Sequence, residues 1–189
     1  MKMRSVFRSL SGLLPVLFLA LVTAAAQDRD HLTAQEVELI REAQELDKRI
    51  DVFIKAIDRR MLGLNGVTQS NAKQLKKDAE KWGELPSGSR TDLIKDIARI
   101  LDEAITNIDD VSEHDAKNPL IAKALRKLAA EVVKVVEQLK PLREQAKTDS
   151  EVASFELLAE NADSIIAAAN KLPPPADKKS EKSKNKPVN

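Results

Sequence analysis

The sequence predicts an all-α protein, built as an up-and-down helical bundle of four main helices plus a short crossover helix, with a disordered C-terminal tail. Apolar residues recur at steps of three and four through most of the chain, which is the period of an amphipathic helix. Aromatic residues make up 3% of the chain and tyrosine is absent, whereas strands draw on aromatic side chains. Four of the five glycines lie between Gly63 and Gly88, so signals for turns are confined to one window.

Residues 1–26 have the order of a secretory signal peptide. Lys2, Arg4 and Arg8 precede an uncharged, mostly apolar run over residues 10–26, which ends in three alanines at positions 24–26. We expect cleavage after Ala26. An uncleaved membrane anchor is the alternative, although this run is marginal in length for a membrane span. Because the chain has no cysteine, it is not a lipoprotein. From the signal peptide we expect it to be exported to the periplasm or the extracellular space.

Residues 27–172 are expected to form the helical bundle domain, and its first helix begins after Thr33. Thr33 and Glu36 have the spacing of a capping box, in which each side chain accepts a hydrogen bond from a free backbone N–H of the first turn. One apolar stripe then continues to Gly63 or Gly66, so we expect a single helix of about 30 residues and roughly 45 Å. The stripe consists of Leu39, Ala43, Leu46, Ile50, Phe53, Ile54, Ile57 and Met61.

The stretch from 67 to 89 predicts the short crossover helix. Ser70 is a candidate N-cap, and Ala72, Leu75, Ala79 and Trp82 fall on one face. Glycines and a proline follow at positions 83–88 and end the helix. We expect this crossover to lay Trp82 over one end of the core.

Three more helices follow, each with its own start signal and its own apolar stripe, which is expected to face the core. The second begins after Ser89, with Asp92 three residues further on. The third opens with Asn118-Pro119, an N-cap followed by proline at the first helical position. Pro141 is expected to kink the third helix late. The fourth follows Asp149 or Ser150. Because the links before the third and fourth helices are short, we expect antiparallel neighbours.

Residues 173–189 are expected to form a disordered tail. Three prolines at positions 173–175 stop the fold, and the remainder is too rich in lysine, serine and asparagine to bury apolar surface. Its five lysines are typical of a solubilising terminus, and contact with an anionic envelope surface by charge alone is the alternative. These lysines are Lys178, Lys179, Lys182, Lys184 and Lys186.

Composition and motifs exclude several classes of site. Without cysteine there is no disulfide, iron–sulfur cluster or thiol catalysis, and no Glu-x-x-His motif is present for a di-iron bundle. We found no phosphate-binding glycine loop, no Gly-x-Ser-x-Gly and no His-Glu-x-x-His. With 31 basic and 30 acidic residues, no strong positive field predicts nucleic-acid binding. We therefore expect no cofactor and no enzymatic activity.

One acidic cluster is a candidate divalent-cation site, because hard cations prefer several oxygen ligands. It lies at the end of the second predicted helix and consists of Asp109, Asp110, Glu113, His114 and Asp115. The spacing fits no calcium loop, so a solvated acidic loop paired with Lys117 and Lys123 is the alternative. Charges also flank the first predicted helix, Asp47, Asp51 and Asp58 along one edge and Arg49 and Arg60 along the other. These flanks are expected to pair with neighbouring helices or to mark the boundary with solvent, and an active site built on them is a further alternative.

Three functions remain open. The first is a protein-interaction or structural module of the bacterial envelope, whose amphipathic helices bind a partner protein. The second is a periplasmic stress or chaperone-like protein: Leu32-Thr33-Ala34-Gln35-Glu36 is similar to the Leu-Thr-x-x-Gln motif of the Spy and CpxP type, with Glu36 in place of Gln. This likeness covers five residues, which also form the capping box, and does not place the chain in that family. The third is divalent-cation binding at residues 109–115.

Overall fold

The computed structural model describes residues 30–174, and this part of the chain is all-helical. The predicted signal peptide and residues 175–189 of the predicted tail lie outside the described residues. No helix in the described range is long and apolar enough to cross a membrane. The helices are α1 (Ala34–Glu42), α2 (Leu46–Asn65), α3 (Gln69–Trp82), α4 (Arg90–His114), α5 (Pro119–Glu144) and α6 (Asp149–Asn170).

The expectation of one long first helix is wrong. The backbone leaves the helical conformation at Ala43, with ψ of 87°, and a second helix starts at Leu46. The break lets α1 fold back against α2, so that Glu36 reaches Arg59 and Arg60. In a continuous helix, residues 36 and 60 would lie about 36 Å apart. Tertiary contacts across this turn therefore override the local apolar period.

Start and stop signals read from the sequence hold for most helices. The Ser89 side chain accepts from the backbone N–H of Asp92, and Asn118 caps α5 with Pro119 at its first position. Gly66, with φ of +81°, ends α2. Two boundaries are shifted: the crossover helix begins after Thr68 rather than at Ser70, and α6 begins after Thr148, whose side chain caps it, rather than after Asp149 or Ser150. The third predicted helix, α5, continues through Pro141 to Glu144.

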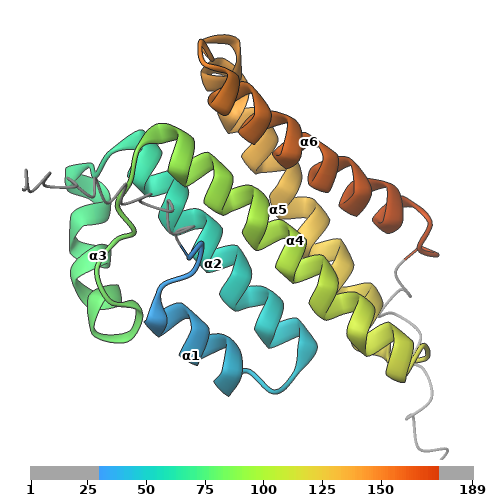
Figure 1. The fold of residues 1–189 in the computed structure, drawn as a ribbon. Coiled ribbons are helices and arrows are strands. Elements are labelled where there is room, and N and C mark those ends of the chain that lie inside the picture. Colours follow the sequence, from blue (N-terminus) through green and yellow to red (C-terminus); the bar gives the residue numbers. More distant parts are fainter. Residues whose placement is uncertain (1–29, 175–189) are drawn as a thin grey trace, which may run out of the picture.

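The apolar core lies among α2, α4, α5 and α6. Helix α2 packs against α4 and α5, and α6 packs against the same two helices from the other side (Figure 1). Helix α1 packs on α2, and α3 touches α1, so both lie on the side of the molecule away from α6. The stripes predicted for each helix supply the core, including Ile50, Phe53, Ile97, Leu128 and Ile165.

Helix α3 contributes no buried residue to that core. Trp82 is half-buried at its last position, and its ring lies against the guanidinium group of Arg59, 5.9 Å from ring centroid to Cζ. Trp82 is therefore not a member of the apolar cluster over which it was expected to lie. A cation–π contact of this kind uses the face of the indole ring.

Candidate functional site

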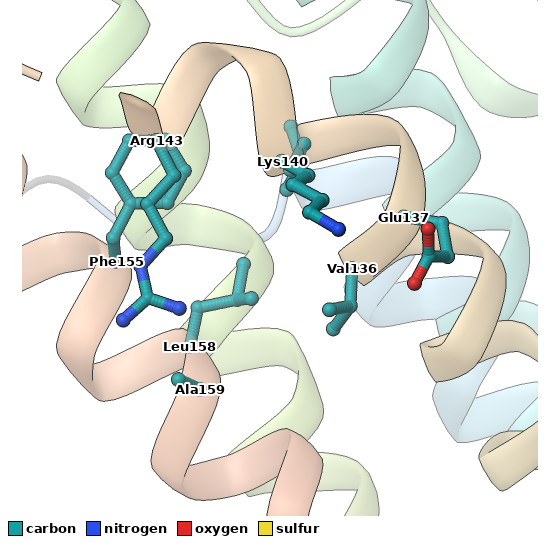
Figure 2. Close-up of a pocket in the computed structure, with 8 residues that line it drawn as sticks. Val136, Glu137, Lys140, Arg143, Phe155, Leu158 and Ala159 are labelled. Carbon is teal, nitrogen blue, oxygen red and sulfur yellow. The ribbon is translucent and has the colours of Figure 1, made fainter. Parts of the chain in front are cut away.

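A groove between α5 and α6 is the candidate site. Its volume is about 220 Å³, and Figure 2 shows side chains from both helices around it. Leu139, Phe155 and Leu158 form a buried apolar floor, each no more than 3% exposed. Half-buried Val136 on α5 and Ala159 on α6 face the same space. An apolar seam thus stays open between two packed helices.

Charged side chains line the rim of this groove on the α5 side. Glu137, Lys140 and Arg143 are exposed and contribute to the lining. Two apolar side chains also remain in solvent near the groove: Val133 on α5 is 49% exposed and Val152 on α6 is 42% exposed. An apolar floor with a charged rim suits contact with an apolar stripe of a partner helix.

The five residues of the candidate cation site all fall at the C-terminal end of α4. Asp109 and Asp110 are exposed on the last turns, and Asp115 is the C-cap. His114 Nδ1 lies 2.6 Å from the backbone oxygen of Asp110. Within residues 30–174, no group of three or more His, Asp or Glu side chains is arranged to hold a metal ion. Cation binding by Asp109, Asp110, Glu113, His114 and Asp115 stays a prediction.

Lys123, expected beside that acidic loop, pairs elsewhere. Its ammonium group hydrogen-bonds to Asp47 on α2 and holds the pKa of that buried carboxyl below its ordinary value. Lys127 forms a second bridge, 2.7 Å from Nζ to Oδ1 of Asp51. On the other edge of α2, Arg49 donates to the side chain of Asn107 on α4 at 2.9 Å. Asp47 and Asp51 on one flank and Arg49 on the other therefore pair with neighbouring helices.

A buried charge cluster around Glu36 was not predicted from the sequence. This carboxylate is fully buried, and its Oε1 accepts from Arg59 Nε at 3.1 Å and from Arg60 Nη1 at 2.5 Å. Its Oε2 accepts from the backbone N–H of Thr33, which completes the predicted capping box. Arg59 and Arg60 are each 1% exposed, and Asp96 Oδ2 on α4 lies 3.9 Å from Arg60 Nε.

The same two arginines also bind backbone oxygens from other segments. Arg60 Nη2 donates to His31 at 2.6 Å, and Arg59 Nη2 donates to Glu84 at 2.5 Å. The cluster therefore joins three parts of the chain to one another: α2, the segment before α1 and the loop after α3. Its only signal in the sequence is two adjacent arginines between Ile57 and Met61 of an apolar stripe. Arg60 Nε has no hydrogen-bond partner among the described residues, but the bonds of the two arginines named above hold one segment to another, so we assign the cluster a structural role.

A partly buried ion pair joins α4 to the start of α6. Arg90 Nε donates to Glu151 Oε1 at 2.7 Å. The backbone N–H of Lys147 also donates to Glu151, and together these bonds lower the pKa of this carboxyl below its ordinary value. This ion pair lies at the same end of the molecule as the α5–α6 groove, because Phe155 of the groove floor is one turn further along α6 than Glu151.

No protein-family model, curated protein or solved structure matches this chain.

Proposed function

We propose that this protein is an exported, non-enzymatic helical bundle that binds a protein partner along α5 and α6. The observation that carries the proposal is the open apolar groove between these helices, with Val133 and Val152 exposed beside it. Exposed apolar side chains next to an open groove are a feature of protein-binding surfaces. The lysine and arginine on the rim supply the polar border that such surfaces have.

The proposed architecture has α2, α4, α5 and α6 as the four main helices of an up-and-down bundle, with α3 as the crossover. Support comes from the packing of α2 and α6 on opposite sides of the α4–α5 pair. Among the described helices, α6 packs against α4 and α5, and its outer surface is proposed as the face that a partner binds.

The proposed location is the bacterial envelope or the space outside the cell. It rests on the order of charged, apolar and small residues over positions 1–26. N-terminal sequencing of the protein recovered from its host tests this part of the proposal. A chain beginning at Gln27 is the expected result, and a chain that retains the apolar run would overturn it.

Site-specific crosslinking in the native host tests the docking face. A photoreactive amino acid replaces Val133 or Val152 in separate variants, and Val67 serves as the matched control. Val67 is also an exposed valine, at 55%, but it lies between α2 and α3. We expect a discrete adduct from positions 133 and 152 and none from 67.

Two other outcomes would overturn the proposal. Adducts with many envelope proteins from all three positions would indicate the chaperone-like activity instead. The absence of any adduct at positions 133 and 152, with the variants present at normal levels, would mean that this face binds no protein.

A further inference from the structure

The junction between α2 and α3 contains the one Asn-Gly dipeptide of the chain, Asn65-Gly66. Asn65 is the last residue of α2, and its side chain is exposed. Gly66 follows as the C-cap, with φ of 81° and ψ of 156°, so the backbone leaves the helix between these two residues. The junction lies in another part of the molecule than the α5–α6 groove, so its chemistry is independent of the proposed function (Figure 1).

An asparagine that precedes glycine can react with its own backbone, and asparagine is among the chemically labile residues of proteins. The backbone nitrogen of Gly66 attacks Cγ of Asn65, the new N–C bond closes a succinimide ring, and the side-chain amide nitrogen leaves as ammonia. Water then opens the ring. Attack of water at Cγ gives aspartate, whereas attack at the backbone carbonyl carbon of residue 65 gives isoaspartate, in which the main chain runs through the former side chain.

Three features of the junction favour this reaction. Within residues 30–174, the C-cap N–H of Gly66 donates to no backbone carbonyl, whereas the C-cap N–H groups of the other five helices each do. Gly66 has no side chain to hinder the approach, and no atom lies within 4 Å of the position that its Cβ would take. The amide of Asn65 is in solvent, so water reaches the ring once it has formed.

Ring closure also needs Asn65 to leave the helical conformation, so that the nitrogen of Gly66 reaches Cγ. The ends of helices fray, and such local opening costs a free energy close to zero. Leu64, one residue earlier, packs against the core and holds the rest of α2 in place. The opening that the reaction needs is therefore confined to the last residue of the helix.

We propose that Asn65 is a site of spontaneous modification, converted through a succinimide to isoaspartate and aspartate in the folded protein. Other asparagines in the described range lack the features of this junction. Asn118 precedes Pro119, which has no N–H to attack. The side chains of Asn107 and Asn161 each donate to a backbone oxygen at 2.9 Å, which holds their amides in place.

Asn170 is the best-matched comparison within the same chain. It is also exposed and is also the last residue of its helix, α6. The next residue is Lys171, which carries a side chain, and its N–H donates to the carbonyls of Ala168 and Ala169. Asn170 therefore shares the exposure and the helix end with Asn65 and lacks the free N–H and the glycine.

Conversion changes the link between α2 and α3 in two ways. Either product adds a carboxylate to the C-terminal end of α2, where the helix dipole disfavours negative charge. Isoaspartate also adds one carbon to the main chain of the link. Helix α3 has no buried residue, and it is joined to α2 by an ion pair of Asp78 with Lys55 at 2.8 Å and by Trp82 against Arg59. Conversion should therefore loosen α3 and leave the apolar core unchanged.

Incubation of the folded, full-length protein at mildly alkaline pH tests the proposal, because base removes the proton from the attacking nitrogen. Peptide mass spectrometry and enzymatic methylation of isoaspartate measure the conversion at residues 65 and 170 in the same samples. We expect residue 65 to convert within about tenfold of its rate in the urea-unfolded chain, since opening at a helix end costs little free energy. Residue 170 should convert more slowly than residue 65 by at least about tenfold.

Two variants identify the source of the signal. Asn65→Gln lengthens the side chain by one carbon, so the same nitrogen would have to close a larger ring, and isoaspartate at this position should disappear. Asn170→Gln is the matched control and should leave the conversion at residue 65 unchanged. Hydrogen exchange of the converted fraction should be faster in α3 and unchanged in α4.

Three results would count against the proposal. A folded chain that stays unmodified at residue 65, while the unfolded chain converts, would show that the fold protects the junction and would overturn the site. Equal conversion at residues 65 and 170 would overturn the role of the free N–H and of Gly66. Unchanged hydrogen exchange of α3 in the converted fraction would overturn the loosening of that helix.

Discussion

Replacing Glu36 by Gln removes the negative charge at the centre of the buried cluster and keeps the size of the side chain. Glu36 is 0% exposed, and two guanidinium groups, from Arg59 and Arg60, converge on its Oε1. The variant leaves both cations buried with one carboxylate near them, that of Asp96 at 3.9 Å from Arg60 Nε. Removing one partner of a buried ion pair costs about 3–5 kcal/mol. Because glutamine still offers an oxygen acceptor and creates no cavity, we expect a loss of about 3 kcal/mol.

Urea and thermal unfolding followed by circular dichroism measure this loss. A drop of about 3 kcal/mol corresponds to a decrease in Tm of roughly 6–12 °C for a chain of this size. Glu38→Gln is the matched control, on the same helix. Glu38 pairs with Arg41 at 2.5 Å, but the two side chains are 61% and 68% exposed, so its loss should cost less than about 0.5 kcal/mol.

A Glu36→Gln variant within about 1 kcal/mol of the wild type would refute the reasoning, as would equal effects of the two substitutions. A second measurement separates charge from packing. Combining Glu36→Gln with Arg60→Met removes one of the stranded cations, so the double variant should lose less stability than the sum of the single variants. Purely additive losses would mean that the two residues do not interact.

Three further predictions concern separate features. Ser89→Ala removes the side-chain cap of α4 and should cost about 1 kcal/mol in urea unfolding, and an unchanged free energy of unfolding would contradict this role of Ser89. Burial raises the pKa of Asp58, with the nearby charge of Glu131 adding to the effect, so its ionised form destabilises the fold at neutral pH. A carboxyl whose pKa is raised on folding costs stability once the pH exceeds its ordinary pKa. Asp58→Asn should therefore raise Tm at pH 7 and lose this advantage near pH 3. No difference between the two pH values would contradict the assignment. Millimolar calcium, magnesium or zinc should raise Tm if residues 109–115 hold a cation, and an unchanged Tm would remove that prediction.

Much of the local structure follows from short-range signals. The capping box at Thr33 and Glu36, the cap at Ser89 and the Asn118-Pro119 start are all where the residues predict them. Each depends on side chains within three positions of the helix start, so the sequence carries the whole signal. The apolar stripes likewise identify the buried faces of α4, α5 and α6, because burial follows the helical period.

The candidate site was less predictable. The apolar residues of α5 and α6 were assigned to the core, and most are there, yet the seam between them stays open at Val136 and Ala159. Whether an apolar side chain lines an open groove or is enclosed in the core depends on how closely the two helices approach each other. That distance is set by their mutual packing and not by the period of either helix.

The sequence by itself determined the helical class, the starts of three helices and the faces that enter the core, because these depend on neighbours within one or two turns. Only the tertiary structure decided that the first apolar stripe breaks at residues 43–45 and that Glu36 is enclosed by Arg59 and Arg60. It also decided that Lys123 joins Asp47, 76 positions away, rather than the adjacent acidic loop. Partners so distant are chosen by the packing of whole helices, because a buried charge is stable only where the fold brings an opposite charge to it.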